Sequence, residues 1–245
     1  MKLRIIKFLK DFLLFTGLLR LLSPLNNVFL FIRNFNKLGQ WIGAHKNDPL
    51  LINDFYVSKR DYSKRFELYK AVSAHFSLDQ KQITYLEFGV ASGSSFFWWA
   101  ANNKNPNSRF FGFDTFEGLP ENWGGFYKKG DMAHDLSGLA LEDSRACFVK
   151  GIFQDTLTGF IASHKGDLSD RPKLIHMDAD LFSSTLFVLS QLYPFLNKGD
   201  LILFDEFNVA NHEFFAFKIF TDSFYVKLRP VAAQNNFYQT AFVVE

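Results

Sequence analysis

The stretch that decides the fold is Tyr85-Leu86-Glu87-Phe88-Gly89-Val90-Ala91-Ser92-Gly93-Ser94-Ser95. The apolar run over residues 83–90 predicts a buried strand, and the two serines after the turn open a helix that is expected to reach residue 103. Glycines in such a turn allow a ligand to approach the backbone closely. The stretch therefore predicts a strand, a ligand-binding turn and a helix in succession.

The spacing of the glycines narrows the choice of ligand. Glu87, Gly89 and Gly93 form the pattern Glu-x-Gly-x-x-x-Gly, whereas the dinucleotide fingerprint is Gly-x-Gly-x-x-Gly. A carboxylate beside a pyrophosphate repels it, but a carboxylate beside an ammonium or sulfonium group attracts it. The pattern therefore disfavours NAD and favours S-adenosylmethionine, and a turn with a purely structural role is the alternative.

Strands and helices alternate on both sides of this stretch. Short apolar strands separated by helices predict an α/β fold whose parallel sheet is covered on both faces. A helix over 61–78 precedes the first strand, and the turn Gln234-Asn235-Asn236 joins two late strands into an antiparallel edge. The expected strands are 83–90, 109–114, 146–150, 173–178, 201–204, 225–231 and 237–244.

An acidic residue also ends the second strand of this series. The sequence there is Phe111-Gly112-Phe113-Asp114-Thr115-Phe116-Glu117-Gly118-Leu119-Pro120, and Asp114 lies 25 residues after Gly89. An acidic residue about 20 residues after the glycine turn, at the next strand end, is where ribose hydroxyls bind. A cap of the following loop is the alternative interpretation of Asp114.

Four carboxylates follow the next two central strands. Asp178 and Asp180 end the strand His176-Met177-Asp178-Ala179-Asp180, and Asp205 and Glu206 end the strand after it. Neighbouring strand ends are about 5 Å apart, so these carboxylates crowd and repel one another. Mg²⁺ relieves such repulsion because it prefers oxygen ligands. We expect Asp178 and Asp205 to bind the metal, whereas Asp180 is equally well explained as a helix cap.

Composition excludes several classes of protein. The 245 residues are 48% hydrophobic and 21% charged, which excludes general disorder. The single cysteine, Cys147, excludes an intramolecular disulfide framework and a zinc site built from several cysteines. A net charge of +2 excludes a dedicated nucleic-acid binder, so no nucleic-acid partner is expected.

The N-terminus differs in character from the rest of the chain. Residues 1–33 contain six Lys or Arg and one Asp, which is a net charge of 6 − 1 = +5. Residues 12–32 have about the length of a membrane span, but Arg20 and Pro24 lie within them and disfavour a spanning helix. Arg4, Lys7 and Asp11 share one helical face. The other face is apolar and carries Ile5, Phe8, Leu9, Phe12, Phe15, Leu19 and Leu22.

Two interpretations of this segment follow. A helix of this pattern packs on its own domain or on a second subunit, or it lies on an anionic membrane surface with its charged face in water. The first interpretation predicts a homo-oligomer if the apolar face is otherwise exposed. The second predicts peripheral membrane contact through residues 1–33.

The strand ends together resemble the macrocin O-methyltransferase family of class I S-adenosylmethionine-dependent methyltransferases. The residues that carry the resemblance are 86–90, 113–120, 151–157, 176–185 and 201–207, and Asp114-Thr115-Phe116-Glu117-Gly118-Leu119-Pro120 is its most specific part. The resemblance implies a Rossmann-like, seven-stranded, mostly parallel sheet with helices on both faces and an antiparallel C-terminal edge strand. The family commonly ends its metal strand Asp-Asp-Tyr, whereas this chain has Asp205-Glu206-Phe207.

The resemblance and the strand-end pattern define an expected site. Metal ligands are expected at Asp178, Asp205 and Glu206, and the catalytic candidates are Asp178 and His134. His134 lies in a loop over 121–138 that, with Trp123, Phe126 and Tyr127, resembles a lid over the acceptor. The expected donor-binding residues are Glu87, Gly89, Val90, Gly93, Ser94, Ser95, Asp114, Thr115, Phe116, Gly151 and Ile152.

Together, these expectations predict that the chain is an O-methyltransferase. It transfers a methyl group from S-adenosylmethionine, with Mg²⁺ or another divalent cation, to a hydroxyl of a sugar or another small-molecule or glycan acceptor. We expect an extension over 1–45, a methyltransferase domain over 46–245, and a location in the cytoplasm or at the inner membrane face. The alternatives are a metal-dependent glycosyltransferase that uses Asp178-Ala179-Asp180, and a non-catalytic binding module of the same fold.

Overall fold

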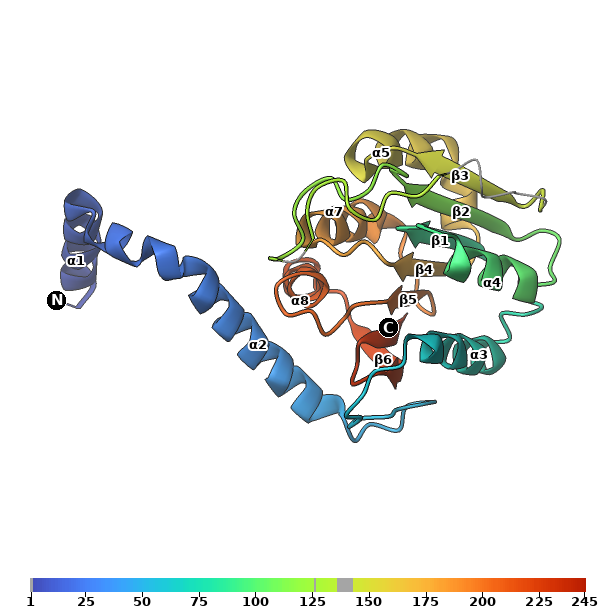
Figure 1. The fold of residues 1–245 in the computed structure, drawn as a ribbon, viewed down its shortest axis with the longest axis horizontal. Coiled ribbons are helices and arrows are strands. Elements are labelled where there is room, and N and C mark those ends of the chain that lie inside the picture. The colour runs from blue at the N-terminus through green and yellow to red at the C-terminus, as the bar shows by residue number, and fades with distance from the viewer. Residues whose placement is uncertain (1, 126, 136–142) are drawn as a thin grey trace.

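The chain folds around one seven-stranded sheet. The computed structural model describes residues 2–125, 127–135 and 143–245. The strand order is β3-β2-β1-β4-β5-β7-β6, and β7 runs opposite to the other six strands (Figure 1). The strands are β1 (Thr84–Phe88), β2 (Arg109–Asp114), β3 (Ala146–Lys150), β4 (Lys173–Met177), β5 (Leu201–Phe204), β6 (Leu228–Gln234) and β7 (Gln239–Val244).

The expected Rossmann-like fold is confirmed, with one refinement at the edge. The C-terminal strand β7 is antiparallel, as expected, but it lies between β5 and β6, so the edge strand is β6. The strand order reverses between β1 and β4, because the chain first builds outward through β2 and β3 and then returns. Ligands of such sheets bind at the carboxyl ends of the strands near this reversal.

Helices cover both faces of the sheet and enclose two apolar cores. One core joins Leu86 and Phe88 of β1 to helices α5, α6, α7 and α8, and the other joins Tyr85 to α3 and α4. Alternate residues of β1 thus point to opposite faces. The helices are α3 (Arg65–Phe76), α4 (Ser94–Asn102), α5 (Phe153–Ser163), α6 (Lys165–Ser169), α7 (Phe182–Leu192) and α8 (Glu213–Phe224), with short 3-10 turns η2 (Tyr62–Lys64) and η4 (Tyr193–Phe195).

The N-terminal helices project from this body as an arm. The arm consists of α1 (Lys2–Thr16), η1 (Leu18–Leu25) and α2 (Asn26–His45) (Figure 1). No residue of α1 or η1 is buried, and α2 buries only Asn34 and Leu38. The expected packing of this segment on its own domain is therefore not observed for α1 and η1. No helix of the described residues is long and apolar enough to cross a membrane.

Gly89 allows the ends of β1 and β4 to approach closely. It has a φ of 97°, and a Cβ at this position would overlap the backbone carbonyl of Asp178. The backbone N–H of Gly89 donates to Phe113, at 2.9 Å, and the N–H of Asp178 donates to Phe88, also at 2.9 Å. The ends of β1, β2 and β4 are thereby joined, and Asp178 is brought to the point where the strand order reverses.

We predict that Gly89→Ala lowers the free energy of unfolding by about 3 kcal/mol or more, because the methyl group overlaps backbone and because a positive φ disfavours an L residue. The matched control is Gly159→Ala in α5, where a Cβ meets nothing within 4 Å. The control should leave the free energy of unfolding unchanged or raise it by up to about 1 kcal/mol. Chemical denaturation measures both, and equal effects would contradict this role of Gly89.

Candidate active site

A pocket opens at the carboxyl ends of β1, β2, β4 and β5. It contains about 850 Å³ of empty space when its open mouth is included. The residues that line it are Tyr62, Arg65, Gly89, Ala91, Asp114, Thr115, Gly118, Leu119, Pro120, Met132, Ile152, Phe153, Gln154, Asp178, Ala179, Asp180, Ser184, Asp205 and Glu206.

Asp114 lies at the end of the pocket that faces the glycine turn. Its Oδ2 accepts hydrogen bonds from the backbone N–H groups of Val90 and Ala91, both at 2.8 Å. Its Oδ1 accepts one from Phe116 at 2.7 Å. The carboxylate thus joins the turn after β1 to the loop after β2 and still lines the pocket. The hydrogen bonds fit the loop-cap interpretation of Asp114, and ribose binding by the same side chain stays a prediction.

The structure brings together only part of the expected donor-binding set. Gly89, Asp114, Thr115 and Ile152 line the pocket. The remaining expected residues are not among those that line the pocket. These residues are Glu87, Val90, Gly93, Ser94, Ser95, Phe116 and Gly151.

Glu87 points into the protein and not into the pocket. Its side chain is 1% exposed and accepts a short hydrogen bond from the hydroxyl of Tyr85, and its Oε2 lies 3.9 Å from Nδ1 of His176. Burial raises the pKa of Glu87 to about 8, and burial lowers the pKa of His176 to about 3. At neutral pH both groups are uncharged, so Glu87 does not present a negative charge to a ligand.

The acids at the ends of β4 and β5 surround an arginine that the sequence interpretation did not include. Nη2 of Arg65 lies 3.1 Å from Oδ2 of Asp205, and its Nη1 lies 3.9 Å from Oδ2 of Asp178. Its guanidinium carbon lies 4.3 Å from the ring centre of Tyr62. Asp205 is 1% exposed, whereas the side chain of Asp178 is 26% exposed and open to the pocket.

The position of Arg65 is set by a segment remote from the strand ends. Asn235 accepts a hydrogen bond from the backbone N–H of Asp61 and donates one to its carbonyl, each at 2.9 Å. Asn236 holds Val57 in the same way, at 2.8 Å in each direction. The turn between β6 and β7 thereby fixes the chain that leads into η2 and α3. The sequence feature that indicates this contact is the pair Asn235-Asn236, because an asparagine side chain can both accept a hydrogen bond from a backbone N–H and donate one to a backbone carbonyl.

Glu206 is held by two tyrosines. Tyr238 donates to its Oε1 at 2.5 Å, and Tyr62 donates to the same oxygen at 3.2 Å. Burial, followed by the charge of Asp180, raises the pKa of Glu206 to about 9. Burial raises the pKa values of Asp180 and Asp205 to about 6. Burial and the charge of Asp205 raise the pKa of Asp178 as well. The cluster therefore resists full ionisation, as crowding predicts.

Asp180 has an unusual backbone. Its φ is 58°, in the left-handed region that few residues other than glycine adopt. The N-cap of α7 is Leu181, which makes no side-chain capping bond. The structure thus does not place Asp180 as the helix cap and directs it to the pocket instead.

The expected lid is only partly described. Phe126 and residues 136–138 lie outside the described residues. Trp123 and Tyr127 stack at 4.9 Å between ring centres. His134 is exposed, its Nδ1 lies 2.9 Å from the carbonyl oxygen of Met132, and it does not line the pocket. Asp178, the other catalytic candidate, does line it.

The cluster offers oxygen atoms that suit a cation. Oδ1 of Asp205 and Oε2 of Glu206 are buried and have no hydrogen-bond partner. Ligand atoms of His176, Asp178 and Asp205 lie within 4.8 Å of one another. His176, however, already contacts Tyr69 and Tyr85 through its two ring nitrogens. The unpartnered carboxylate oxygens therefore fit a hard cation better than the imidazole does.

Comparison with known proteins identifies the class of enzyme. Residues 86–207 match a family model described as a methyltransferase domain. The chain is similar in structure to the calicheamicin methyltransferase CalS11, with a TM-score of 0.60, 22% identity, and coverage of 86% of this chain and 91% of that one. No curated protein matches it in sequence.

Two further structures share the fold. The apo structure of CalS11, described as a TDP-rhamnose 3'-O-methyltransferase, matches with a TM-score of 0.53, 22% identity, and coverage of 86% and 93%. The O-methyltransferase NovP matches with a TM-score of 0.52, 19% identity, and coverage of 74% and 79%. The family match and the shared fold define an enzyme of the S-adenosylmethionine-dependent methyltransferase class. The narrower likeness to the macrocin family rests on the sequence motifs alone.

We predict that Glu87→Gln changes the pH dependence of stability. The folded chain keeps the Glu87 proton up to about pH 8, whereas the unfolded chain loses it near the ordinary value of 4.5. The stabilisation carried by this proton is complete below the unfolded pKa and is lost as the pH rises through the folded one.

Glutamine cannot ionise. The free energy of unfolding of the variant should therefore rise relative to that of the natural protein, by about 1.4 kcal/mol per pH unit at most, between about pH 5 and pH 8. Thermal or urea unfolding across that range measures the difference. A constant difference would show that Glu87 is ionised in the folded chain.

Proposed function

We propose that the chain transfers the methyl group of S-adenosylmethionine to a hydroxyl of a sugar or glycosylated small-molecule acceptor, with the help of a divalent cation such as Mg²⁺. The observation that carries the proposal is the pocket itself, in which the glycine turn after β1 faces a cluster of four carboxylates. The names of CalS11 and NovP support oxygen as the methyl acceptor, and the name of CalS11 supports a sugar.

The donor is assigned to the end of the pocket formed by the turns after β1, β2 and β3. Gly89 has no side chain there, Asp114 offers carboxylate oxygens for ribose hydroxyls, and Ile152 offers an apolar surface for the adenine ring. The donor supplies a methyl group already activated on a positively charged sulfur. The residues of the chain therefore need to position the acceptor and remove its proton.

The cation is assigned to Asp178, Asp205 and Glu206. The fit rests on the unpartnered oxygens of Asp205 and Glu206 and on the partly exposed carboxylate of Asp178. A divalent cation bound there would lower the pKa of an acceptor hydroxyl and neutralise the crowded acids. Because Arg65 already occupies one side of Asp205, the cation would share the carboxylates with the guanidinium.

Asp178 is the residue proposed to accept the proton of the acceptor hydroxyl. It lines the pocket with a side chain that is 26% exposed, so its carboxylate can reach an acceptor hydroxyl. His134 is not retained for this role, because the described structure places it outside the pocket lining. The methyltransferase-domain match weighs against the glycosyltransferase alternative, although Asp178 and Asp180 both line the pocket.

We predict that Asp178→Ala and Asp205→Ala retain donor binding but lower turnover by about 10²–10⁴-fold, because they remove the proton acceptor or a metal ligand. Calorimetry with S-adenosylhomocysteine measures binding. Release of S-adenosylhomocysteine in the presence of nucleotide-linked deoxysugars measures turnover. Asp222→Ala, an exposed change on α8, is the matched control. Unchanged turnover of both variants in the presence of EDTA would refute the metal and base assignments together.

We also predict that Arg65→Gln tightens Mg²⁺ binding several-fold, because it removes a positive charge that lies 3.1 Å from a proposed ligand, Asp205. Calorimetric titration with MgCl₂ alone measures the change without an assay of activity. Arg60→Gln, on a nearby arginine that contacts Asn208 and not the acids, is the control. Weaker Mg²⁺ binding by Arg65→Gln would contradict a cation site on these carboxylates.

A further inference from the structure

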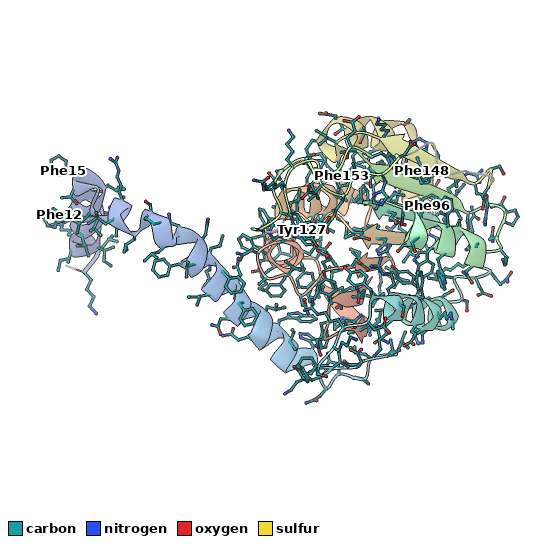
Figure 2. All side chains as sticks on the ribbon, viewed as in Figure 1. Phe12, Phe15, Phe96, Tyr127, Phe148 and Phe153 are labelled. Atoms are coloured by element: carbon teal, nitrogen blue, oxygen red, sulfur yellow. The ribbon has the colours of Figure 1, made fainter. Side chains whose placement is uncertain are left out.

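Helices α1 and η1 of the arm expose many large apolar side chains, and the described body buries none of them. Phe15 is 91% exposed, Leu21 80% and Phe8 72%. Figure 2 shows Phe12 and Phe15 at the far end of the arm, whereas Phe96 and Phe148 lie in the body. Soluble proteins rarely expose apolar patches of this extent, and such patches mark surfaces that contact a protein or a membrane.

The charge of the arm distinguishes between these two occupants. Arg4, Lys7 and Lys10 follow one another at intervals of three residues along one side of α1, and this side lies roughly 120° around the helix from Phe8 and Phe12. The net charge of residues 1–33 is +5, while the body is slightly acidic. A second copy of the arm carries the same net positive charge and so offers no complementary surface to these residues, whereas an anionic bilayer neutralises them.

The helices suit a position in the plane of a bilayer. A helix of 15 residues is about 22 Å long, which is less than the hydrocarbon thickness of about 30 Å. Interfacial helices combine one apolar face with Lys or Arg at the polar face, and long basic side chains reach up to the lipid phosphates. Gly17, with a φ of 63°, ends α1 and turns the chain into η1, which carries Leu18, Leu21 and Leu22 exposed.

We propose that α1 and η1 lie in the headgroup region of an anionic phospholipid membrane and hold the methyltransferase body at its surface. The apolar faces enter the lipid, and Lys2, Arg4, Lys7 and Lys10 contact the phosphates. The aromatic contacts of Trp41 with Phe207, Phe217 and Phe237 attach the other end of α2 to the body. The α2 helix of 20 residues, about 30 Å long, then links membrane and body. This role is independent of the proposed reaction.

The full chain is tested by sedimentation with vesicles of phosphatidylcholine alone, or of two parts phosphatidylcholine and one part phosphatidylglycerol. We expect binding to the anionic vesicles to be at least about tenfold stronger than to the neutral ones and to weaken with salt. The variant R4E/K7E/K10E should lose this preference, whereas the charge-conserving variant R4K/K7R/K10R should keep it. The variant F8S/F12S should lose binding, whereas F8L/F12L should keep it.

Light scattering without lipid and circular dichroism accompany the binding assay. Equal unfolding temperatures of the variants show that the body is folded, since the substituted side chains are exposed and remote from it. The proposal is overturned if the folded natural protein stays in the supernatant with anionic vesicles. It is equally overturned if the chain forms dimers that F8S/F12S dissociates while vesicle binding is insensitive to the charge of the lipid, because the arm is then an interface between copies.

Discussion

The guanidinium of Arg65 lies between the carboxylates that end β4 and β5, and the candidate site depends on this arrangement. Parallel strands bring their carboxyl ends to one edge of the sheet, so acids placed after adjacent strands meet there. Asp178 and Asp205 cannot both be ionised in a buried position without a positive charge nearby. Arg65 supplies one such charge at 3.1 Å from Asp205, yet oxygens of Asp205 and Glu206 stay unpartnered. The site is thus only partly compensated, which favours a further cation.

Distant parts of the chain cooperate to hold this arrangement. The turn between β6 and β7 fixes the backbone at Val57 and Asp61 through Asn235 and Asn236. That contact delivers Tyr62 and Arg65 to the pocket, while Tyr238, just after the same turn, binds Glu206. The antiparallel strands beside β5 therefore do more than close the sheet, because their turn supports the acidic side of the site.

The sequence predicted the sheet well because apolar runs and glycine turns mark each strand locally. It also predicted Asp178, Asp205 and Glu206 at one edge of the sheet. Once the strands are located, the parallel topology brings their carboxyl ends together. Glu87 does not line the pocket, because by strand periodicity it shares the face of Tyr85, which packs against α3 and α4. Arg65 was missed because its partners lie more than 110 residues away in the sequence, and no local pattern records such a contact. The order of β7 and β6 also depends on tertiary contacts alone.

A crystal structure of the full chain grown with S-adenosylhomocysteine and Mg²⁺ tests the central claim most directly, because it observes both halves of the pocket at once. The account predicts the ribose beside Asp114, the adenine against Ile152, and a cation on carboxylate oxygens of Asp178, Asp205 and Glu206. A nucleoside bound elsewhere, together with acids contacted by Arg65 alone, would contradict it.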